Sequence, residues 1–422
     1  MKVVIHDLTK EEWEKIADRY AGWHVIATNK KGNPCIGCFG CWVKDPGECV
    51  IKDGVENVGT LMHHAEEVTV ISRYTYGGFG SHVKRVFDRS IGGVLPFFEG
   101  VDGEMQHKKR YEKCVPMTFV FRGKNLTEEE KAQGKKYAEA VCRNLRSRVK
   151  GVSFEETEDL GIDIENAGGS SAWKKNSKKS QVSEELPEHT TILLNCSLRA
   201  DNANSKKFLD RLSTGIAGNK KHINLSSYLK KKEELISMLM QADKVVLGIP
   251  LYVDGIPSAP LQLMEKMEQI LSQVAQGEAR ADAKTDAKTD VWADSTNVKN
   301  KRIYVVANMG LYESRQLSNL LYMVRSWCDK CGMIYSGGVA IGAGEMLGNM
   351  MKAQRIDKGP AGNVAVAFDR LVNAMNANDD KEDVFVEPAG FPRKIYMFLA
   401  NLGWPGDGKK NGLKKKDLYR QK

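Results

Sequence analysis

The chain of 422 residues contains no stretch that approaches the roughly 20 consecutive apolar residues needed to span a bilayer. It also lacks a recognisable secretory signal, because "MKVVIHDLTKEEW" turns acidic where a signal would stay apolar. We therefore expect a cytoplasmic protein without a membrane partner. Metalloprotease (HExxH), Walker and Ser/His/Asp patterns are missing as well, so none of those reaction classes has support in the sequence.

Cysteine and charge narrow the choice further. Nine cysteines, an odd number without an export signal, argue against a disulfide framework and favour thiols or metal ligands. The formal net charge of +9 raises the question of nucleic-acid binding, but much of the excess lies in two runs, at 173–179 and 409–422. Neither run has aromatic residues interleaved among clustered cations, with only Trp173 at the edge of one and Tyr419 near the end of the other, so we expect solvated, flexible segments and no nucleic-acid partner.

Short apolar runs alternate with amphipathic helical patterns, and this alternation occurs in both halves of the chain. The runs are KVVIHD, WHVIAT, VTVISRYTYG, VPMTFVFRG and VKGVSFEE in the first half, and TTILLNCS, KHINLSS, KVVLGIPLY, KRIYVVANMG and MIYSGGVAIG in the second. Such alternation predicts parallel βαβ units. The expected fold is therefore α/β, with two tandem, doubly wound parallel sheets.

Segments without periodicity divide the chain. "GIDIENAGGSSAWKKNSKKSQVSEELPEH" reads as a linker, and the tandem "DAKTDAKTD" cannot bury an apolar face. We predict a first domain at 1–157, a linker at 158–188, a second domain at 189–345 with a polar insertion at 271–300, and a C-terminal helix and basic tail at 346–422. The aromatic segment "FPRKIYMFLANLGWPGDGKKNG" should dock on the body through its apolar residues before the tail frays.

The second half opens with a strand that ends in "NCSLRADNANSKKFL", a loop rich in hydroxyls and amides followed directly by a helix. A helix N-terminus favours an anion, and Arg199 adds positive charge. The simpler alternative is that Asn204 or Ser205 caps the helix. The length of the loop favours a phosphate site, because capping needs only one such residue. The candidate residues are Ser197, Arg199, Asn202, Asn204 and Ser205.

At these residues the chain resembles the flavodoxin-like NAD(P)H-dependent FMN reductases, in which the loop after the first strand holds the FMN phosphate. Two later loops, within "GIPLYVDGIPSAPLQLMEKM" and "NMGLYES", match the family's ring-binding loops. All three follow consecutive strands, where ligands collect in open α/β sheets. The resemblance implies that the isoalloxazine ring is lined by Pro250, Leu251, Tyr252, Val253 and Gly255, with Asp254 near its polar edge, and that backbone donors come from Asn308, Met309, Gly310 and Leu311.

The first half resembles the cysteine-bearing, iron–sulfur flavoprotein-like subgroup of the same family. Its cysteine loop leads to a Y-x-G turn and a K-x-x-x-DR helix, here Tyr74, Tyr76, Gly77, Gly78, Lys84, Asp88 and Arg89. It departs from the family at "HDLTKEEWEKI", where the turn is short and Glu11 and Glu12 would repel a phosphate. We expect a fused pseudo-dimer with one FMN site in the second half, either alone or as a homo-oligomer. Tyr74, Tyr76 and Phe79 either wall that site or are core or exposed turn residues.

Four cysteines, Cys35, Cys38, Cys41 and Cys49, form Cys-x2-Cys-x2-Cys-x7-Cys. This spacing could ligate a [4Fe–4S] cluster, whose motifs often begin with such a triplet, whereas structural zinc sites pair two cysteines with a distant second pair. The loop could equally hold redox-active or weakly metal-binding thiols, or be a turn stabilised by apolar packing. The sequence leaves these three readings open.

The resemblance implies an FMN-dependent oxidoreductase that passes electrons from NAD(P)H to a small quinone-, flavin- or disulfide-like acceptor, or to a redox protein. The flavin carries the chemistry, so no catalytic side chain is required. One alternative is an electron-transfer iron–sulfur flavoprotein with a [4Fe–4S] cluster. Another is a non-catalytic flavodoxin-like scaffold or sensor.

Overall fold

The computed structural model describes residues 1–28, 32–157, 186–187, 189–275, 298–353 and 355–422. Nearly all of the linker expected at 158–188 lies outside these residues, as does most of the insertion expected at 271–300. Within the described residues, no helix is long and apolar enough to cross a membrane.

The first half forms a parallel sheet in the order β2-β1-β3-β7-β8. Its strands are β1 (Val3–His6), β2 (His24–Ala27), β3 (Val68–Thr75), β7 (Pro116–Gly123) and β8 (Arg148–Glu156), and the short β4 (Gly78–Phe79) pairs antiparallel with β3. Numbered among themselves, the five parallel strands follow the flavodoxin order 2-1-3-4-5. The apolar runs at β1 and β3 are buried because helices cover both faces of such a sheet.

The second half repeats the arrangement in the order β10-β9-β11-β12-β13-β14. Its strands are β9 (Thr190–Asn195), β10 (Asn219–Asn224), β11 (Lys244–Pro250), β12 (Arg302–Asn308), β13 (Ile334–Ile341) and β14 (Val384–Val386), all parallel to their neighbours. The first five again follow the order 2-1-3-4-5, and β14 extends the sheet from the C-terminal segment. The predicted fold class, two doubly wound parallel sheets, is confirmed.

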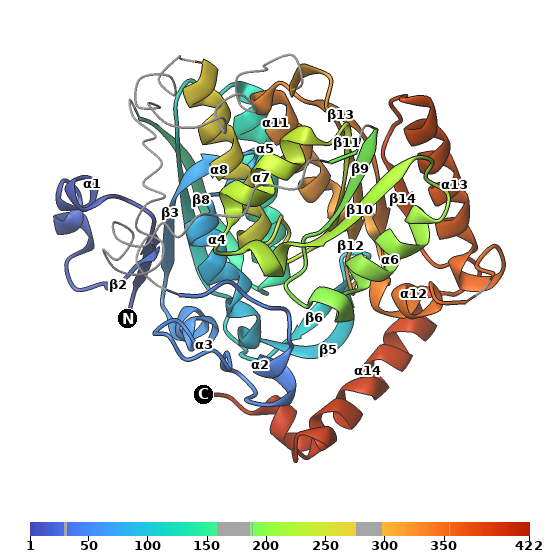
Figure 1. The fold of residues 1–422 in the computed structure, drawn as a ribbon. Helices are drawn as coiled ribbons and strands as arrows, with labels where there is room; N and C mark the ends of the chain where they lie inside the picture. The colour runs from blue at the N-terminus through green and yellow to red at the C-terminus, as the bar shows by residue number, and fades with distance from the viewer. Residues whose placement is uncertain (29–31, 158–185, 188, 276–297, 354) are drawn as a thin grey trace.

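Helices cover both sheets and fill the space between them (Figure 1). The first half contains α1 (Lys10–Glu14), α2 (Gly40–Val43), α3 (Val58–His64), α4 (Ser81–Asp88) and α5 (Glu128–Asn144). The second half contains α6 (Asn204–Ser213), α7 (Lys232–Gln241), α8 (Ser258–Ala275), α11 (Ser318–Cys331), α12 (Gly344–Met350), α13 (Gly362–Ala377) and α14 (Arg393–Lys410). One hydrophobic cluster runs through both halves and includes Phe79, Tyr137, Ile256 and Met323. The two sheets therefore share a core.

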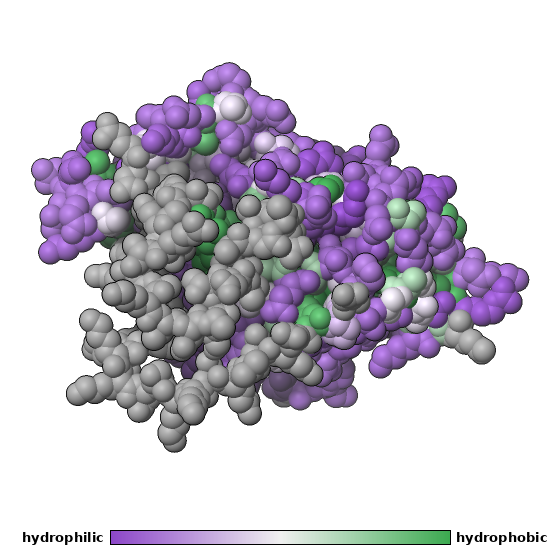
Figure 2. All heavy atoms as spheres, turned by 45° about the horizontal axis from the view of Figure 1, so that its top comes forward, coloured by the Kyte–Doolittle hydropathy of each residue, from purple (hydrophilic) through white to green (hydrophobic). Residues whose placement is uncertain are grey.

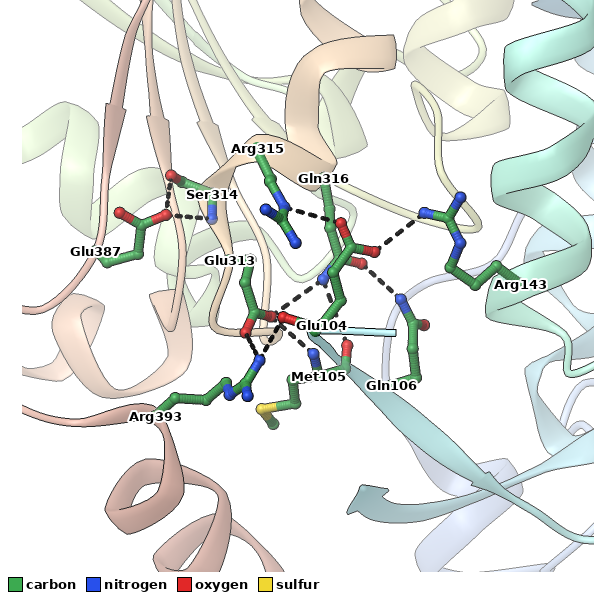
Figure 3. Close-up of polar contacts among 11 residues, drawn as sticks. Glu104, Met105, Gln106, Arg143, Glu313, Ser314, Arg315, Gln316, Glu387 and Arg393 are labelled. Atoms are coloured by element: carbon green, nitrogen blue, oxygen red, sulfur yellow. Dashed lines mark hydrogen bonds and ion pairs between the residues drawn. The ribbon is translucent and has the colours of Figure 1, made fainter. Parts of the chain in front are cut away.

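A hairpin that the sequence patterns did not indicate joins the halves. It is formed by β5 (Val94–Val101) and β6 (Glu104–Lys109), which belong to the first half. Figure 3 shows its contacts with the loop after β12: Met105 N donates to Glu313 Oε2 (2.8 Å), Arg315 Nε to Glu104 Oε1 (2.9 Å) and Gln106 Nε2 to Gln316 Oε1 (2.9 Å). The bonds of Met105 and Gln106 are buried, and buried bonds of this kind hold the halves in one relative position.

The expectation that the C-terminal tail frays is wrong. Leu418 is fully buried, and the Arg110 guanidinium donates to the backbone carbonyls of Leu418 (2.9 Å) and Arg420 (2.6 Å). Lys422 forms an ion pair with Asp45 (2.7 Å). The tail is thus held against the first half by a buried arginine that its carbonyl groups satisfy.

The apolar residues of the preceding aromatic segment dock only in part. Tyr396 on α14 is buried, whereas Phe398 and Leu402 on the same helix are exposed. On the face in Figure 2, by contrast, the described residues are mostly hydrophilic and the hydrophobic ones form small separate groups.

Candidate functional site

A cavity of about 430 Å³ lies where the two halves meet, within the size range of small-molecule sites. The loops after β9, β11 and β12 line it from the second half, and the cysteine loop and the hairpin line it from the first. Twelve of the fifteen predicted cofactor-binding residues are brought together there: Ser197, Arg199, Asn204, Ser205, Pro250, Leu251, Tyr252, Val253, Asn308, Met309, Gly310 and Leu311. Asn202, Asp254 and Gly255 are not among the lining residues.

The N-terminus of α6 faces one end of this cavity. The helix begins at Asn204, and its N-cap residue Ala203 provides no side-chain acceptor. Asn204 and Ser205 are therefore the first helical residues and do not cap the helix from outside. Because the first N–H groups of a helix have no intrahelical acceptor, this uncapped end can bind an anion.

The side chains around this helix end already hold a carboxylate. Asn204 Nδ2 donates to Glu345 Oε2 (2.6 Å), and Arg199 Nη1 lies 3.8 Å from the same oxygen. Lys207 Nζ donates to Asn204 Oδ1 (2.9 Å), so a second cation stands close by. The Glu345 carboxylate thus occupies the donors at this helix end, which suit an anionic oxygen, and a bound phosphate would have to displace it.

The loop after β12 is tied to the same place. Asn308 Nδ2 donates to Ser205 Oγ (2.8 Å), and the Asn308 carbonyl accepts from Leu251 N (2.9 Å). Met309 N donates to Ile341 O (3.2 Å). The Met309 N–H is therefore engaged within the sheet, although the sequence reading had counted it as a donor for a ligand.

The turn after β11 explains why Asp254 and Gly255 leave the cavity. Tyr252 and Gly255 exchange backbone hydrogen bonds of 3.2 and 3.1 Å, and the two residues between them have positive φ, 39° for Val253 and 57° for Asp254. This is the backbone of a tight two-residue turn. It directs Asp254 into the boundary between the halves, where burial raises the pKa of its carboxyl to about 7.

Helix α4 of the first half, which carries the K-x-x-x-DR motif, contacts this turn and stabilises it. Lys84 on α4 is fully buried, and its ammonium donates to the Asp88 carboxylate and to the backbone carbonyl of Tyr252. Asp88 Oδ2 accepts from Ser258 N at the start of α8 (2.7 Å). Asp88 also lines the cavity, and burial raises the pKa of its carboxyl while Lys84 opposes the rise. A motif of one half therefore positions a loop of the other.

The cysteine loop forms the opposite wall. Arg89 holds it by an ion pair with Asp53 (2.6 Å), and Cys35 lines the cavity. Gly37 N donates to Cys35 Sγ (3.4 Å), while burial raises the pKa of the Cys35 thiol to about 12. Such a thiol stays protonated at neutral pH.

The four cysteines of this loop are all free thiols. Cys38 is exposed, while Cys41 and Cys49 are buried. Among the residues that the structure describes, no group of three or more His, Cys, Asp or Glu side chains is arranged to hold a metal ion. The described residues therefore give no support for a metal site at this loop.

The aromatic wall of the cavity comes from residues that sequence reasoning missed. Phe39 and Trp42 stack at 5.5 Å, Trp404 meets Trp42 edge-on at 5.4 Å, and Phe98 and His107 complete the wall. Burial lowers the pKa of His107 to about 4, so its ring is neutral at pH 7. Aromatic residues in the cysteine loop and in the C-terminal segment were the available signal, but only the topology shows that they meet.

The aromatic residues considered as walls from the sequence lie elsewhere. Tyr74 donates to the Glu130 carbonyl (2.8 Å), Tyr76 donates to the Glu268 carboxylate, and Phe79 is fully buried. None of the three lines the cavity. All three instead belong to the hydrophobic core, as the alternative prediction states.

The corresponding turn of the first half is closed by its own side chains. Thr9 and Glu12 form a capping box at α1, and Glu12 also pairs with Arg122 (2.7 Å). His6 and Trp13 stack at 4.2 Å across the turn. The space that a ligand would use in the second half is filled here.

No family model matches the chain. An iron–sulfur flavoprotein of Methanocaldococcus jannaschii is 33% identical over 84 residues, which cover 20% of this chain and 42% of that protein. Among solved structures, an azoreductase from Bacillus anthracis is 12% identical with a TM-score of 0.28, covering 44% of this chain and 99% of its own. A flavone reductase is 11% identical with a TM-score of 0.34, covering 50% and 70%. The chain thus spans less than half of the curated relative that it matches.

Proposed function

We propose that the protein is a flavin-dependent oxidoreductase that takes electrons from NAD(P)H through FMN to a small quinone-, flavin- or disulfide-like acceptor. The observation that carries the proposal is the convergence of three loops, from the ends of β9, β11 and β12, on one cavity. Ligands collect at this edge of open α/β sheets. The name of the Methanocaldococcus relative, a flavoprotein, agrees with it.

The residues around the cavity fit FMN at both ends. The uncapped start of α6, with Arg199 and Asn204, would hold the phosphate in place of the Glu345 carboxylate. Trp42 and Trp404 would cover the ring system and exclude water. FMN, when bound, would supply hydride acceptance and redelivery.

The chain's contribution would be to bind, orient and polarise. We assign the N–H groups of Gly310 and Leu311 to the polar edge of the ring, because the Met309 N–H is engaged by Ile341. Preorganised donors of this kind stabilise negative charge as it develops. Lys84, held by the Asp88 carboxylate, would fix the turn of Tyr252 against the ring.

FMN uptake tests the proposal directly. The purified protein should show a yellow flavin spectrum, or its apo form should take up one FMN per chain. The triple variant S197A/R199A/N204A should bind FMN at least about tenfold more weakly, because charge-assisted bonds to the phosphate are lost. The variant R211A/S213A, at the other end of the same helix, is the matched control and should bind as the unaltered protein does.

The outcomes separate the alternatives. A colourless protein that takes up no FMN would favour the scaffold or sensor reading. Equal FMN affinity in the triple variant and the control would remove the second half as the site. Iron and acid-labile sulfide after anaerobic purification would favour the iron–sulfur flavoprotein alternative, which the present arrangement of thiols does not support.

A further inference from the structure

Helix α14 has two different faces. Tyr396, Ala400 and Trp404 point inward and line the cavity. The outward side chains are apolar and exposed: Ile395 (48%), Phe398 (62%), Leu399 (51%) and Leu402 (59%). Their spacing of i, i+3, i+4 and i+7 places them on one stripe of the helix. A stripe of this size facing water marks a contact surface.

The charge around this stripe is strongly positive. Residues 393–422 contain nine Lys and Arg and two Asp, a side-chain charge of +7, of which Arg393 is paired with Glu313 and Lys422 with Asp45. Lys394, Lys409 and Lys410 are exposed on the helix itself, and the run 414–416 that follows is exposed as well. Because Arg110 holds the tail by its carbonyl groups, these cations stay next to the helix.

We propose that the exposed face of α14, with the basic residues at 409–416, docks this protein on the surface of an anionic lipid bilayer. Apolar residues on one face and lysines beside them are the features of helices that lie in the membrane interface, with the apolar face buried by about 5–10 Å. Basic residues near such a surface are attracted by anionic headgroups. The proposal departs from the expectation of no membrane partner, which rested only on the lack of a spanning segment.

A lipid surface fits this face better than a second copy of the chain. A twofold contact through α14 would bring two regions of the same strong positive charge together. Stable protein interfaces also bury about 800 Å² on each partner, whereas this stripe consists of four side chains on one helix. A bilayer supplies both the apolar phase and the opposite charge.

Docking would place the cavity close to lipid, because the inward face of the same helix lines it. A helix with its side chains is about 10 Å thick, so an acceptor dissolved in the bilayer would lie near the cavity. This corollary rests on the proposed flavin function. The docking itself does not, and its test below uses no enzymatic readout.

Vesicle flotation of the full-length protein tests the docking. It should bind vesicles of phosphatidylcholine mixed with phosphatidylglycerol, bind phosphatidylcholine alone weakly, and be released by salt. The variant F398S/L402S should bind the mixed vesicles at least about tenfold more weakly, because two exposed apolar side chains no longer enter the interface. K414Q/K415Q/K416Q should lose affinity for the mixed vesicles only.

The matched control is V366S, which changes an exposed apolar residue of α13 (53% exposed) and should bind as the unaltered protein does. All the altered side chains are exposed, and an unchanged circular dichroism spectrum would verify folding. Failure to bind the mixed vesicles would overturn the proposal, as would equal binding by F398S/L402S and V366S. A dimer that F398S/L402S dissociates, without vesicle binding, would instead identify a second copy as the partner.

Discussion

The ammonium of Lys84, in the first half of the chain, donates a hydrogen bond to the backbone carbonyl of Tyr252, in the second half. Lys84 is fully buried and Tyr252 is half-buried, and the Asp88 carboxylate balances the lysine charge. The turn that follows β11 therefore depends for its position on a helix that belongs to the other sheet.

Replacing Lys84 by Met should be strongly destabilising. It leaves the Asp88 carboxylate buried without its partner, which costs about 3–5 kcal/mol in comparable cases. Urea unfolding measures this loss. The double variant K84M/D88N should recover part of the stability but not FMN affinity, because the Tyr252 carbonyl still lacks its donor. Equal urea midpoints for K84M and the unaltered protein would show that the pair contributes nothing.

Gly37 tests the approach of the cysteine loop to the cavity. A Cβ there would lie 2.0 Å from the Tyr252 hydroxyl oxygen, at a φ of +67°. G37A should therefore displace the loop and weaken FMN binding. Gly54 is the matched control, because its φ is +92° and no atom lies within 4 Å of the added Cβ. G54A should cost about 1 kcal/mol of backbone strain and leave FMN affinity unchanged. Equal FMN affinity in the two variants would argue against the close contact.

Asp254 should make stability depend on pH. Burial raises the pKa of its carboxyl from 3.8 to about 7, while Arg143 and Lys84 oppose the rise and Glu104 adds to it. The folded protein therefore holds a proton that the unfolded chain releases, and the free energy of unfolding falls as pH rises from about 4 to 7, by up to about 4 kcal/mol.

D254N should remove this fall, since Asn tolerates the same left-handed backbone and carries no charge. Unfolding by urea at several pH values across this window measures it. The stability of the variant relative to the unaltered protein should rise with pH. D102N is the control, because Asp102 also has a positive φ, 48°, but is exposed. If the free energy of unfolding changed with pH in the same way for D254N and the unaltered protein, Asp254 would not be a buried carboxyl with a raised pKa.

The thiols should react in an order set by exposure. Cys38 and Cys114 are exposed and should react first with a disulfide reagent, so C38S and C114S should each remove one rapid equivalent. Cys35 should react slowly because burial raises the pKa of its thiol to about 12, and FMN should slow it further. A chelator that released additional reactive thiols from anaerobically purified protein would contradict free cysteines in this loop.

Much of the fold followed from local pattern. The apolar runs that became β1, β3, β9 and β11 are buried on both faces, which leaves a signal visible in one short window. The three loops of the cavity could also be found, because the carboxyl ends of parallel strands share one edge. Local pattern and the family resemblance together therefore pointed to most of the residues by which the second half lines the cavity.

What could not be predicted depends on contacts between distant segments. Trp42 and Trp404 meet edge-on although 362 positions separate them, and no local pattern encodes that meeting. Asp254 was assigned to the cavity by its place in the loop, but two residues with positive φ turn it away. The tail was expected to be solvated because it is rich in lysine. Leu418 is nevertheless buried, because Arg110 of the first half binds the tail's carbonyl groups.

Because both halves belong to one chain, the cavity between them persists when the protein is diluted. In a pair of identical subunits, a pocket at the contact is lost when the subunits separate, and each surface change occurs twice by symmetry. Here the walls meet within one molecule, so their encounter is intramolecular and does not depend on protein concentration. Each half is also free to change alone, which is how one turn can be filled by Trp13 while its counterpart at Asn204 lines the cavity.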